Sequence, residues 1–180
     1  MASELHVDAI KHSGGTSALT IDSSGNLITS ANFRSAGSII QLVTNTTSTI
    51  TTVDTTTYTD SGLTCQITPK FSSSKIFIVV SQQFRIRHAS TDVGMGWKIF
   101  RDSTNVKSSN VNYALYIYEE SSGGVDWRGW QTWNYLDSPS TTSQITYKTQ
   151  ISRYASSGTA TLRAQDNNNP STMTLMEIAQ

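Results

Sequence analysis

The chain has 180 residues, which suits one main domain with an appendage, because domains cluster near about 100 to 150 residues. Lysine and arginine together number 13, aspartate and glutamate also number 13, and only 14% of residues are charged. Without a bulk electrostatic field to attract polyanions, we expect neither nucleic acid nor an anionic membrane as a partner. Serine and threonine supply about three residues in ten, which is typical of the strands and turns of an all-β protein.

Cysteine content and hydropathy exclude further classes of protein. The single cysteine, Cys65, excludes a disulfide within the chain and a cysteine-based zinc cluster, and we interpret it as a small core side chain. The N-terminus lacks an apolar run behind a basic segment, and no stretch is long enough to cross a membrane. We therefore expect synthesis in a cytoplasm without membrane insertion.

Residues 1–36 differ from the rest and are expected to form an extended N-terminal arm. Leu5, Val7 and Ile10 are separated by charged and polar residues. Two short β-prone runs between residues 18 and 29 flank a glycine-containing turn, which predicts a hairpin. Because an isolated hairpin is marginal in water, the arm is either a frayed terminus or packs against a neighbour. We favour an attachment arm that anchors through Leu5, Val7 and Ile10.

Residues 37–180 are expected to form one β-sandwich domain. Short β-prone runs recur about every 10 to 15 residues with turn residues between them, and no 3.6-residue apolar stripe indicates a helix. The expected strands are 38–43, a solvated threonine-rich edge strand within 44–60, then 63–67, 75–87, 93–101, 113–118, 127–136, 143–153, 158–164 and 172–179. So many antiparallel strands pack most naturally as two sheets, which predicts an all-β antiparallel β-sandwich of the jelly-roll type.

The segment 75–87 reads as a central strand. Its first half is apolar on both parities, and since alternate side chains of a strand point to opposite faces, both faces there should be dry. In the second half one parity is polar, so we expect the face that carries Gln83 and Arg85 to return to water. The cover over Phe77 and Val79 is most simply a second chain.

The segment 113–135 is rich in aromatic residues. Its first part is again apolar on both parities, so we expect Tyr116 and Tyr118 at the same subunit interface as Phe77 and Val79.

On the following strand, Trp127, Trp133 and Tyr135 share one face, whereas Arg128 and Trp130 point the other way. One set must be core. An exposed tryptophan beside arginine suits stacking on a sugar ring or a protein hot spot, so Arg128 and Trp130 are candidate ligand or receptor contacts. The alternative is that Trp130 is buried at a subunit seam.

The sequence carries little sign of catalysis. The histidines His6, His12 and His88 have no metal-ligand spacing and are expected to be solvated. There is no nucleophile elbow, phosphate loop or dinucleotide fingerprint, and no evident carboxylate pair for glycoside cleavage. Residues 166–169 could offer oxygen ligands to calcium, as could the acidic residues around Gly123, but ordinary turn chemistry explains them. We expect no enzyme, no cofactor and no metal site.

Four segments, taken in order, resemble a family of bacteriophage virion proteins that is frequent among marine phages and described as structural or fibre-like. They are SGLTCQITPKFSSSKIFIVV at 61–80, GWKIFRDSTNV at 96–106, YLDSPSTTSQITYKTQISR at 135–153 and STMTLMEIAQ at 171–180. The resemblance implies a trimeric jelly roll similar to the tumour-necrosis-factor-like heads of phage fibres. A threefold axis would then cover the strands that are apolar on both faces.

The function that this resemblance implies is that of a virion protein, made in the bacterial host cytoplasm and displayed as a homotrimeric fibre or spike. Its arm would contact other virion proteins, and its domain would contact a host-surface glycan or protein without catalysis. The alternative is a capsid decoration or cement protein that stabilises the shell. A carbohydrate-active enzyme is a third possibility.

Overall fold

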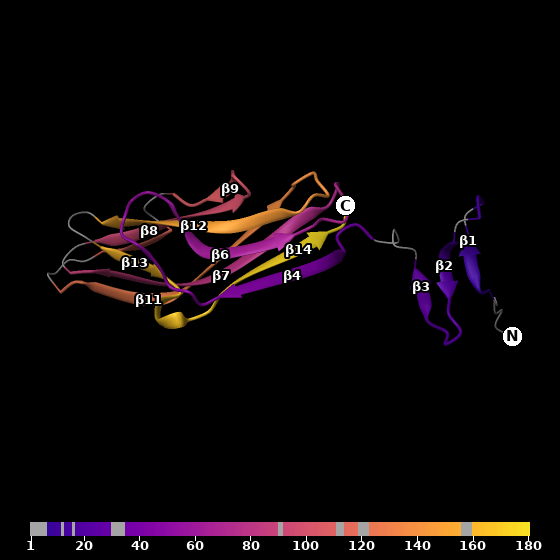
Figure 1. Ribbon diagram of the computed structural model, residues 1–180, viewed down its shortest axis with the longest axis horizontal. Helices are drawn as coiled ribbons and strands as arrows, with labels where there is room; N and C mark the ends of the chain where they lie inside the picture. Colours follow the sequence, from indigo (N-terminus) through magenta and orange to yellow (C-terminus); the bar gives the residue numbers. More distant parts are fainter. Residues whose placement is uncertain are drawn as a thin grey trace. The chain divides into compact units, whose positions relative to one another are not determined.

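In the computed structural model, the described residues are 7–11, 13–15, 17–29, 35–89, 92–110, 114–118, 123–155 and 160–180. The chain divides into two compact units, Met1–Ser38 and Ile39–Gln180 (Figure 1). Antiparallel strands make up nearly all the regular structure, together with one 3₁₀ turn, η1 (Asp166–Asn168). The predicted all-β class is confirmed.

The first unit is a three-stranded antiparallel sheet of β1 (Ala9–Lys11), β2 (Ser17–Ile21) and β3 (Leu27–Thr29). The predicted hairpin is the β2–β3 pair, and β1 is a strand that the sequence pattern did not indicate. In the hairpin turn the Asp22 carboxylate accepts the backbone N–H groups of Ser24 and Asn26, at 2.9 and 2.8 Å. The side-chain amide of Asn26 also donates to it and lowers the pKa of Asp22.

The expected anchor residues lie in or near this first unit. Ile10 is exposed, as is Ile21 on the paired strand, and Val7 is half-buried. Leu5 lies outside the described residues. A sheet this small has little apolar area of its own to bury, and it presents isoleucine side chains to solvent.

The second unit contains two sheets that lie face to face (Figure 1). The first, here called the β7 sheet, contains β4 (Ile39–Thr47), β5 (Thr51–Val53), β7 (Lys75–His88), β11 (Val125–Asp137), β13 (Thr161–Ala164) and β14 (Ser171–Ile178). The second, the β12 sheet, contains β6 (Thr59–Ile67), β8 (Val93–Arg101), β9 (Thr104–Ser108), β10 (Leu115–Ile117) and β12 (Ile145–Ala155).

Strand β7 is central, as predicted. It pairs with β11 along one edge over its whole length, and on the other edge with β14 first and then with β13. Numbered in chain order, the strands β4, β6, β7, β8, β9, β11, β12 and β14 lie in the order 1-8-3-6 in the β7 sheet and 2-7-4-5 in the β12 sheet. This is the jelly-roll order, so the predicted topology is also confirmed.

The core lies between the sheets and follows the expected alternation. In β6 the side chains of Leu63, Cys65 and Ile67 are buried and their neighbours exposed, and burial raises the pKa of the Cys65 thiol. Trp133 of β11 stacks on Trp97 of β8 with ring centroids 4.6 Å apart, which joins the two sheets.

The threonine-rich stretch 44–60 is not one edge strand, as was expected, but parts of three. Strand β4 continues to Thr47, β5 is a separate short strand, and β6 begins at Thr59. Strands β4 and β5 do lie at the margins of the β7 sheet. Val53 is buried, because β5 pairs with β13 and turns this side chain into the core.

A ring of polar side chains crosses the core, which the apolar patterning did not predict. Thr149 donates its hydroxyl to Gln82 Oε1 at 2.9 Å, and Gln82 Nε2 donates to Ser61 Oγ at 2.8 Å. The Ser61 hydroxyl then donates to Thr149 Oγ1, which closes the ring. The side chain of Gln165 extends it, since its carbonyl oxygen accepts from Gln82 Nε2 and Ser171 Oγ. Because every buried partner is satisfied, the ring holds the two sheets in one register.

His88 is the second correction. It was expected to be solvated, but it is buried, because it lies at the end of β7 on the core-facing parity, opposite Val125 of β11. His6 and His12 lie outside the described residues.

Candidate binding site

The outer face of the β7 sheet, which points away from the core, carries the residues of interest. On β7 the even-numbered side chains, such as Ile76, Ile78 and Val80, are fully buried, so the odd-numbered ones point outward. Residues directly opposed on neighbouring strands point to the same face, so the strand registers divide this outer face into cross-strand rows.

One end of the face is apolar. Leu42, Met176, Phe77 and Leu136 are directly opposed across β4, β14, β7 and β11. Leu42 and Leu136 are 56% and 45% exposed, whereas Phe77 and Met176 are half-buried. Ile39 and Ile178 are opposed in the next row, where β7 contributes Lys75, and Val79 lies in the row on the other side, opposite Thr174. We call the seven apolar residues of these rows the apolar end.

Both faces of the first half of β7 were expected to be equally dry, and the structure does not bear this out. The core-facing side chains are fully buried, but Phe77 and Val79 are only half-buried. Their own row neighbours shield their flanks and leave the open side of the face to solvent or to another chain.

A buried carboxylate holds the strand ends beneath the apolar end. Glu177, next to Met176, accepts Gln41 Nε2 at 2.6 Å and the backbone N–H groups of Lys70 and Phe71 at 2.9 and 3.2 Å. Burial favours a raised pKa for Glu177, but these hydrogen bonds outweigh it, and the pKa lies below its usual 4.5.

The middle of the face carries hydroxyl groups. Thr44 and Thr174 are opposed with their Oγ1 atoms 3.2 Å apart, and Thr46 and Thr172 with theirs 3.0 Å apart. These pairs satisfy one another and accept water at the same time, so this part of the surface requires no partner.

The other end carries arginines. Arg163 of β13, Arg85 of β7 and Arg128 of β11 are directly opposed in one row, and Arg87 lies in the next row opposite Asp126. Like charges directly opposed across strands are destabilising. We call the three opposed residues the arginine row.

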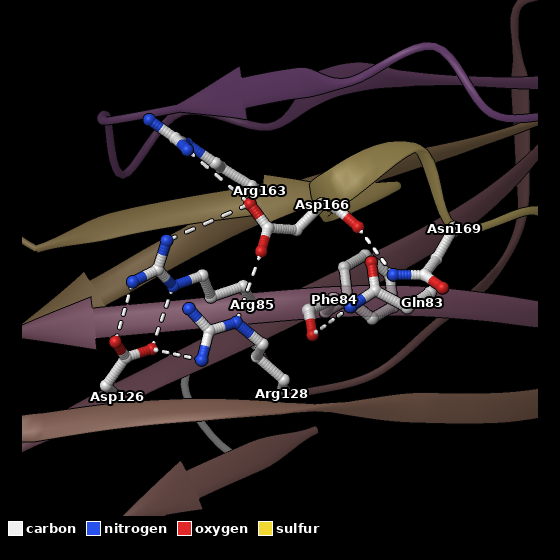
Figure 2. Close-up of polar contacts among 8 residues, drawn as sticks. All are labelled: Gln83, Phe84, Arg85, Asp126, Arg128, Arg163, Asp166 and Asn169. Carbon is white, nitrogen blue, oxygen red and sulfur yellow. Dashed lines mark hydrogen bonds and ion pairs between the residues drawn. The ribbon is translucent and has the colours of Figure 1, made fainter.

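Two aspartates offset part of this charge (Figure 2). The two carboxylate oxygens of Asp126 accept hydrogen bonds from Arg85 in a two-pronged contact, one from Nε at 2.8 Å and one from a terminal nitrogen at 2.6 Å. The same contact lowers the pKa of Asp126 and raises that of Arg85. Asp166 receives Arg128 Nε at 3.3 Å and a terminal nitrogen of Arg163 at 3.5 Å, and its side chain is 6% exposed.

A hollow of 470 Å³ opens beside this cluster. It is lined by Ile50, Arg85, Arg128, Arg163 and residues 166–169. The backbone at Gln165, Asn167 and Asn168 has φ between 55° and 57°, the left-handed region that asparagine tolerates and glutamine rarely adopts. This turn lifts η1 over β7 and forms one wall of the hollow.

Gln83 is the third correction, because the face that carries it was expected to return to water. It is buried, since its backbone N–H donates to Ser171 Oγ and its carbonyl accepts from Gln165, both at 3.0 Å, where η1 crosses β7. Figure 2 shows the Gln83 side chain beside Asn169, the residue that follows η1.

Parity separated Arg128 and Trp130 from Trp133 without showing which set is core, and the structure places Arg128 and Trp130 on the outer face. Arg128 lines the hollow, and Trp130, two residues along β11, is 53% exposed and opposes Gln83. The other set, with Trp133 buried and Trp127 and Tyr135 packed against the core, faces inward.

The four residues expected at one subunit interface do not lie together. Phe77 and Val79 are on the outer face of the β7 sheet, whereas Tyr116 belongs to β10 in the β12 sheet, where it opposes Gly94. The Tyr116 hydroxyl donates to Asp92 at 2.7 Å, and its ring lies 6.0 Å from that of Tyr154. Tyr118 follows β10 and is exposed.

Sequence patterning did not identify the arginine row, and it treated Asp166 as an ordinary turn residue and not as an ion-pair partner of that row. Arg85, Arg128 and Arg163 are distant along the chain, and only strand pairing places them side by side. A weak local signal exists, because Asp126 and Arg128 are two apart on one strand and so share a face.

Within the described residues no helix has the length and apolarity to cross a membrane. In the same part of the chain no group of three or more histidine, cysteine or acidic residues is arranged to hold a metal ion.

Fold and site together define a jelly-roll domain with an arginine-lined hollow on one outer face. No family model and no curated protein matches the sequence. Solved structures with some similarity include infectious bursal disease virus, Gx strain, with 13% identity over 84% of this chain and 40% of that chain, at a TM-score of 0.38. The T=1 particles derived from infectious bursal virus give 14% identity over 91% of this chain and 40% of that chain, at a TM-score of 0.38.

A bacterial protein, dimeric latent PorU from Porphyromonas gingivalis, gives 11% identity over 83% of this chain and 14% of that chain, with a TM-score of 0.31. The present chain spans about 40% of the length of the viral chains it matches. At these identities and TM-scores the likeness carries no argument about function.

Proposed function

We propose that the chain is a structural protein of a bacteriophage virion, displayed as a homotrimeric fibre or spike that contributes to host-surface attachment without catalysis. The observation that carries the proposal is the apolar end of the outer face. Its exposed leucines lie beside half-buried Phe77 and Val79, and a second copy of the chain is the simplest cover for them. The sequence resemblance to phage virion proteins supports the same conclusion.

The fold is compatible with this role, because jelly rolls are a common architecture of viral capsid and lectin domains. Phe77 and Val79 form the proposed subunit contact. Tyr116 lies in β10 of the other sheet and Tyr118 directly follows that strand, so they would form a second, separate contact with a neighbouring copy.

The N-terminal unit is the proposed attachment arm. Its three short strands expose Ile10, with Val7 half-buried nearby, and a sheet of this size gains most of its stability from a neighbour. Other virion proteins are the proposed neighbours, which would place the protein in the virion after its synthesis in the host cytoplasm.

The receptor contact is proposed at Arg128 and Trp130, with a host-surface glycan or protein as the partner. Both side chains are half exposed and lie on one face of β11. An arginine and a tryptophan on an open surface are the residues most enriched at binding hot spots.

A capsid decoration or cement protein is the second candidate. The exposed isoleucines of the N-terminal unit favour it to the same extent, because an arm that orders on a shell would also stabilise that shell. This role requires a trimer but no receptor.

Particles that lack the protein separate the two roles. A fibre predicts that such particles adsorb poorly to host cells, and that the purified protein blocks infection by competition. A cement protein predicts normal adsorption with rupture on mild heating. If the protein is missing from purified particles on analysis by mass spectrometry, both roles fail.

A further inference from the structure

Like charges directly opposed across neighbouring strands are unfavourable, so the arginine row is an unusual sheet surface. Two rows further along the same face, Thr172, Ser81 and Thr132 are directly opposed, and small hydroxyl side chains of this kind suit a strand surface. Placing Arg163, Arg85 and Arg128 directly opposite one another adds repulsion instead. A local rule that is broken without a gain in packing marks a functional position.

The cluster keeps an excess of positive charge. Among the described residues of this cluster, four arginines, including Arg87, surround two aspartates, which leaves an excess of two positive charges. Arg85 is committed to Asp126 through its two-pronged contact. Arg128 and Arg163, which flank Arg85 on either side, are 52% and 41% exposed. They share Asp166 and so keep one net positive charge between them, and Arg87 carries the other.

Arg128 and Arg163 are held in place, but their hydrogen-bond donors are not all used. A guanidinium has five N–H donors. Asp166 accepts Nε of Arg128 and one terminal nitrogen of Arg163, and Asp126 lies 3.5 Å from a terminal nitrogen of Arg128. Within the described part of the chain these contacts leave donors on both guanidiniums for an incoming anion, and a carboxylate matches their planar fork.

The surroundings suit a sugar better than a small inorganic ion. A volume of 470 Å³ falls in the usual range for ligand sites, about 300 to 1,000 Å³. The side chains at 167–169 offer amide donors and acceptors for hydroxyl groups, and Ile50 offers an apolar contact. Trp130 does not line the hollow, but it is exposed two residues along β11 on the same face as Arg128 and offers an aromatic platform to a second sugar ring.

We infer that the hollow beside η1 binds an acidic saccharide, with the sugar carboxylate between Arg128 and Arg163, the hydroxyl groups on the asparagine turn, and a neighbouring ring on Trp130. This rests on the proposed attachment role and names the chemical class of the receptor. Asp126 and Asp166 are positioning residues, because they orient the guanidiniums and do not contact the ligand.

The test is calorimetric titration of the purified full-length protein. The probes are a uronic-acid oligosaccharide, its carboxyl-reduced neutral analogue, a sulfated oligosaccharide of the same length and inorganic phosphate. We expect the uronic-acid probe to bind at least tenfold more tightly than each of the other three. Equal affinity for the neutral analogue overturns the inference, and so does a preference for sulfate or for free phosphate.

Variants locate the site. Arg128→Gln and Arg163→Gln should each weaken binding of the uronic-acid probe at least tenfold, and Trp130→Ala several-fold. Lys107→Gln on β9, in the other sheet, is the matched control and should bind as the parent does. Because the arginine row repels itself, Arg163→Gln should also leave the melting temperature unchanged or raised. Undiminished binding by folded Arg128→Gln and Arg163→Gln overturns the site.

The outcome is distinct from failure of the proposed function. Binding is measured on the isolated protein, so it stands or falls whether or not the protein occurs in particles. A protein that occurs in particles but ignores the uronic-acid probe overturns the inference alone. Binding without occurrence in particles overturns the virion role alone.

Discussion

The two ends of the outer face of the β7 sheet break different rules of sheet surfaces. The apolar end aligns Leu42, Met176, Phe77 and Leu136 across four strands, whereas the arginine row aligns Arg163, Arg85 and Arg128 across three. The first leaves hydrocarbon in water and the second opposes like charges. Between them, hydroxyl rows do neither.

The comparison indicates that one strand can carry two binding surfaces of opposite chemistry. Along β7 the outward side chains change from Phe77 through Ser81 to Arg85, while the inward ones stay buried throughout. The inward parity maintains the core, so the outward parity is free to change within a few residues. An apolar end suits a copy of the chain, and a cationic end suits a soluble anion.

The largest expected effect is at the apolar end. Phe77→Asp should abolish self-association, since a charge buried in a dry interface costs roughly 3 to 5 kcal/mol. Val79→Asp should act in the same direction. Thr132→Asp, on the same face in the hydroxyl region, is the control and should leave the assembly intact.

Sedimentation velocity at micromolar concentration measures the oligomeric state of these variants, and circular dichroism confirms that each one is folded. A trimer of normal stability carrying Phe77→Asp would contradict the proposed contact. So would a parent protein that is monomeric at that concentration.

The second effect is a loss of folding stability at low pH, caused by protonation of Glu177. The pKa of Glu177 is lowered in the folded state, so its contribution is complete above about pH 4.5, where both states are ionised. Below that value the unfolded chain takes up the proton first, and the free energy of unfolding falls as pH drops through the lower folded pKa. Loss of the buried charge-assisted hydrogen bonds should remove about 2 to 3 kcal/mol.

Urea denaturation at several pH values measures this loss. Glu177→Gln should be less stable at neutral pH and should show a shallower decline in acid. Asp126, at the other end of the face, also has a lowered pKa, but its side chain is more than a third exposed, so Asp126→Asn should change the acid slope less. An unchanged acid slope in Glu177→Gln would refute the assignment.

The third effect distinguishes members of the arginine row. Arg85→Gln removes the two-pronged partner of Asp126 and should lower the free energy of unfolding by about 1 to 2 kcal/mol. Chemical denaturation measures the change. A variant as stable as the parent would mean that the Arg85–Asp126 ion pair does not stabilise the fold, so that Arg85, like Arg128 and Arg163, carries a charge that the fold does not require.

The smallest effect is that of Arg163→Gln. Asp166 keeps Arg128 and Arg85 nearby, and one unit of repulsion disappears, so stability should change by no more than about 0.5 kcal/mol. The same denaturation series measures it. A loss as large as that of Arg85→Gln would show the row to be structural throughout.

Much of the fold could be predicted from the sequence because the alternation of buried and exposed residues in a strand is visible within a short segment. Alternation in Leu63, Cys65 and Ile67 gave the buried face of β6 correctly, and the parity of β11 separated Trp133 from Trp130. The pattern did not indicate β9, nor the division of residues 44–60 among three strands, because uniform threonine has no alternation to read.

The site was less predictable. Gln83 carries the outward parity of β7 and looked solvent-facing, but η1, some 80 residues further along the chain, covers it. Gln82 has the core-facing parity of β7, and only the folded domain shows that it joins the buried ring with Ser61 and Thr149. Neither outcome is visible without knowing which segments meet.

Patterns within single segments were sufficient to establish an all-β sandwich, its central strand and the opposite directions of Trp130 and Trp133 on β11. The alternation of side chains is a consequence of backbone geometry, which needs no information from elsewhere in the chain. The alignment of Arg85, Arg128 and Arg163 depends instead on the registers of β11 and β13 against β7. Those registers are set by how the buried faces pack, so the row and the hollow beside it exist only in the folded domain.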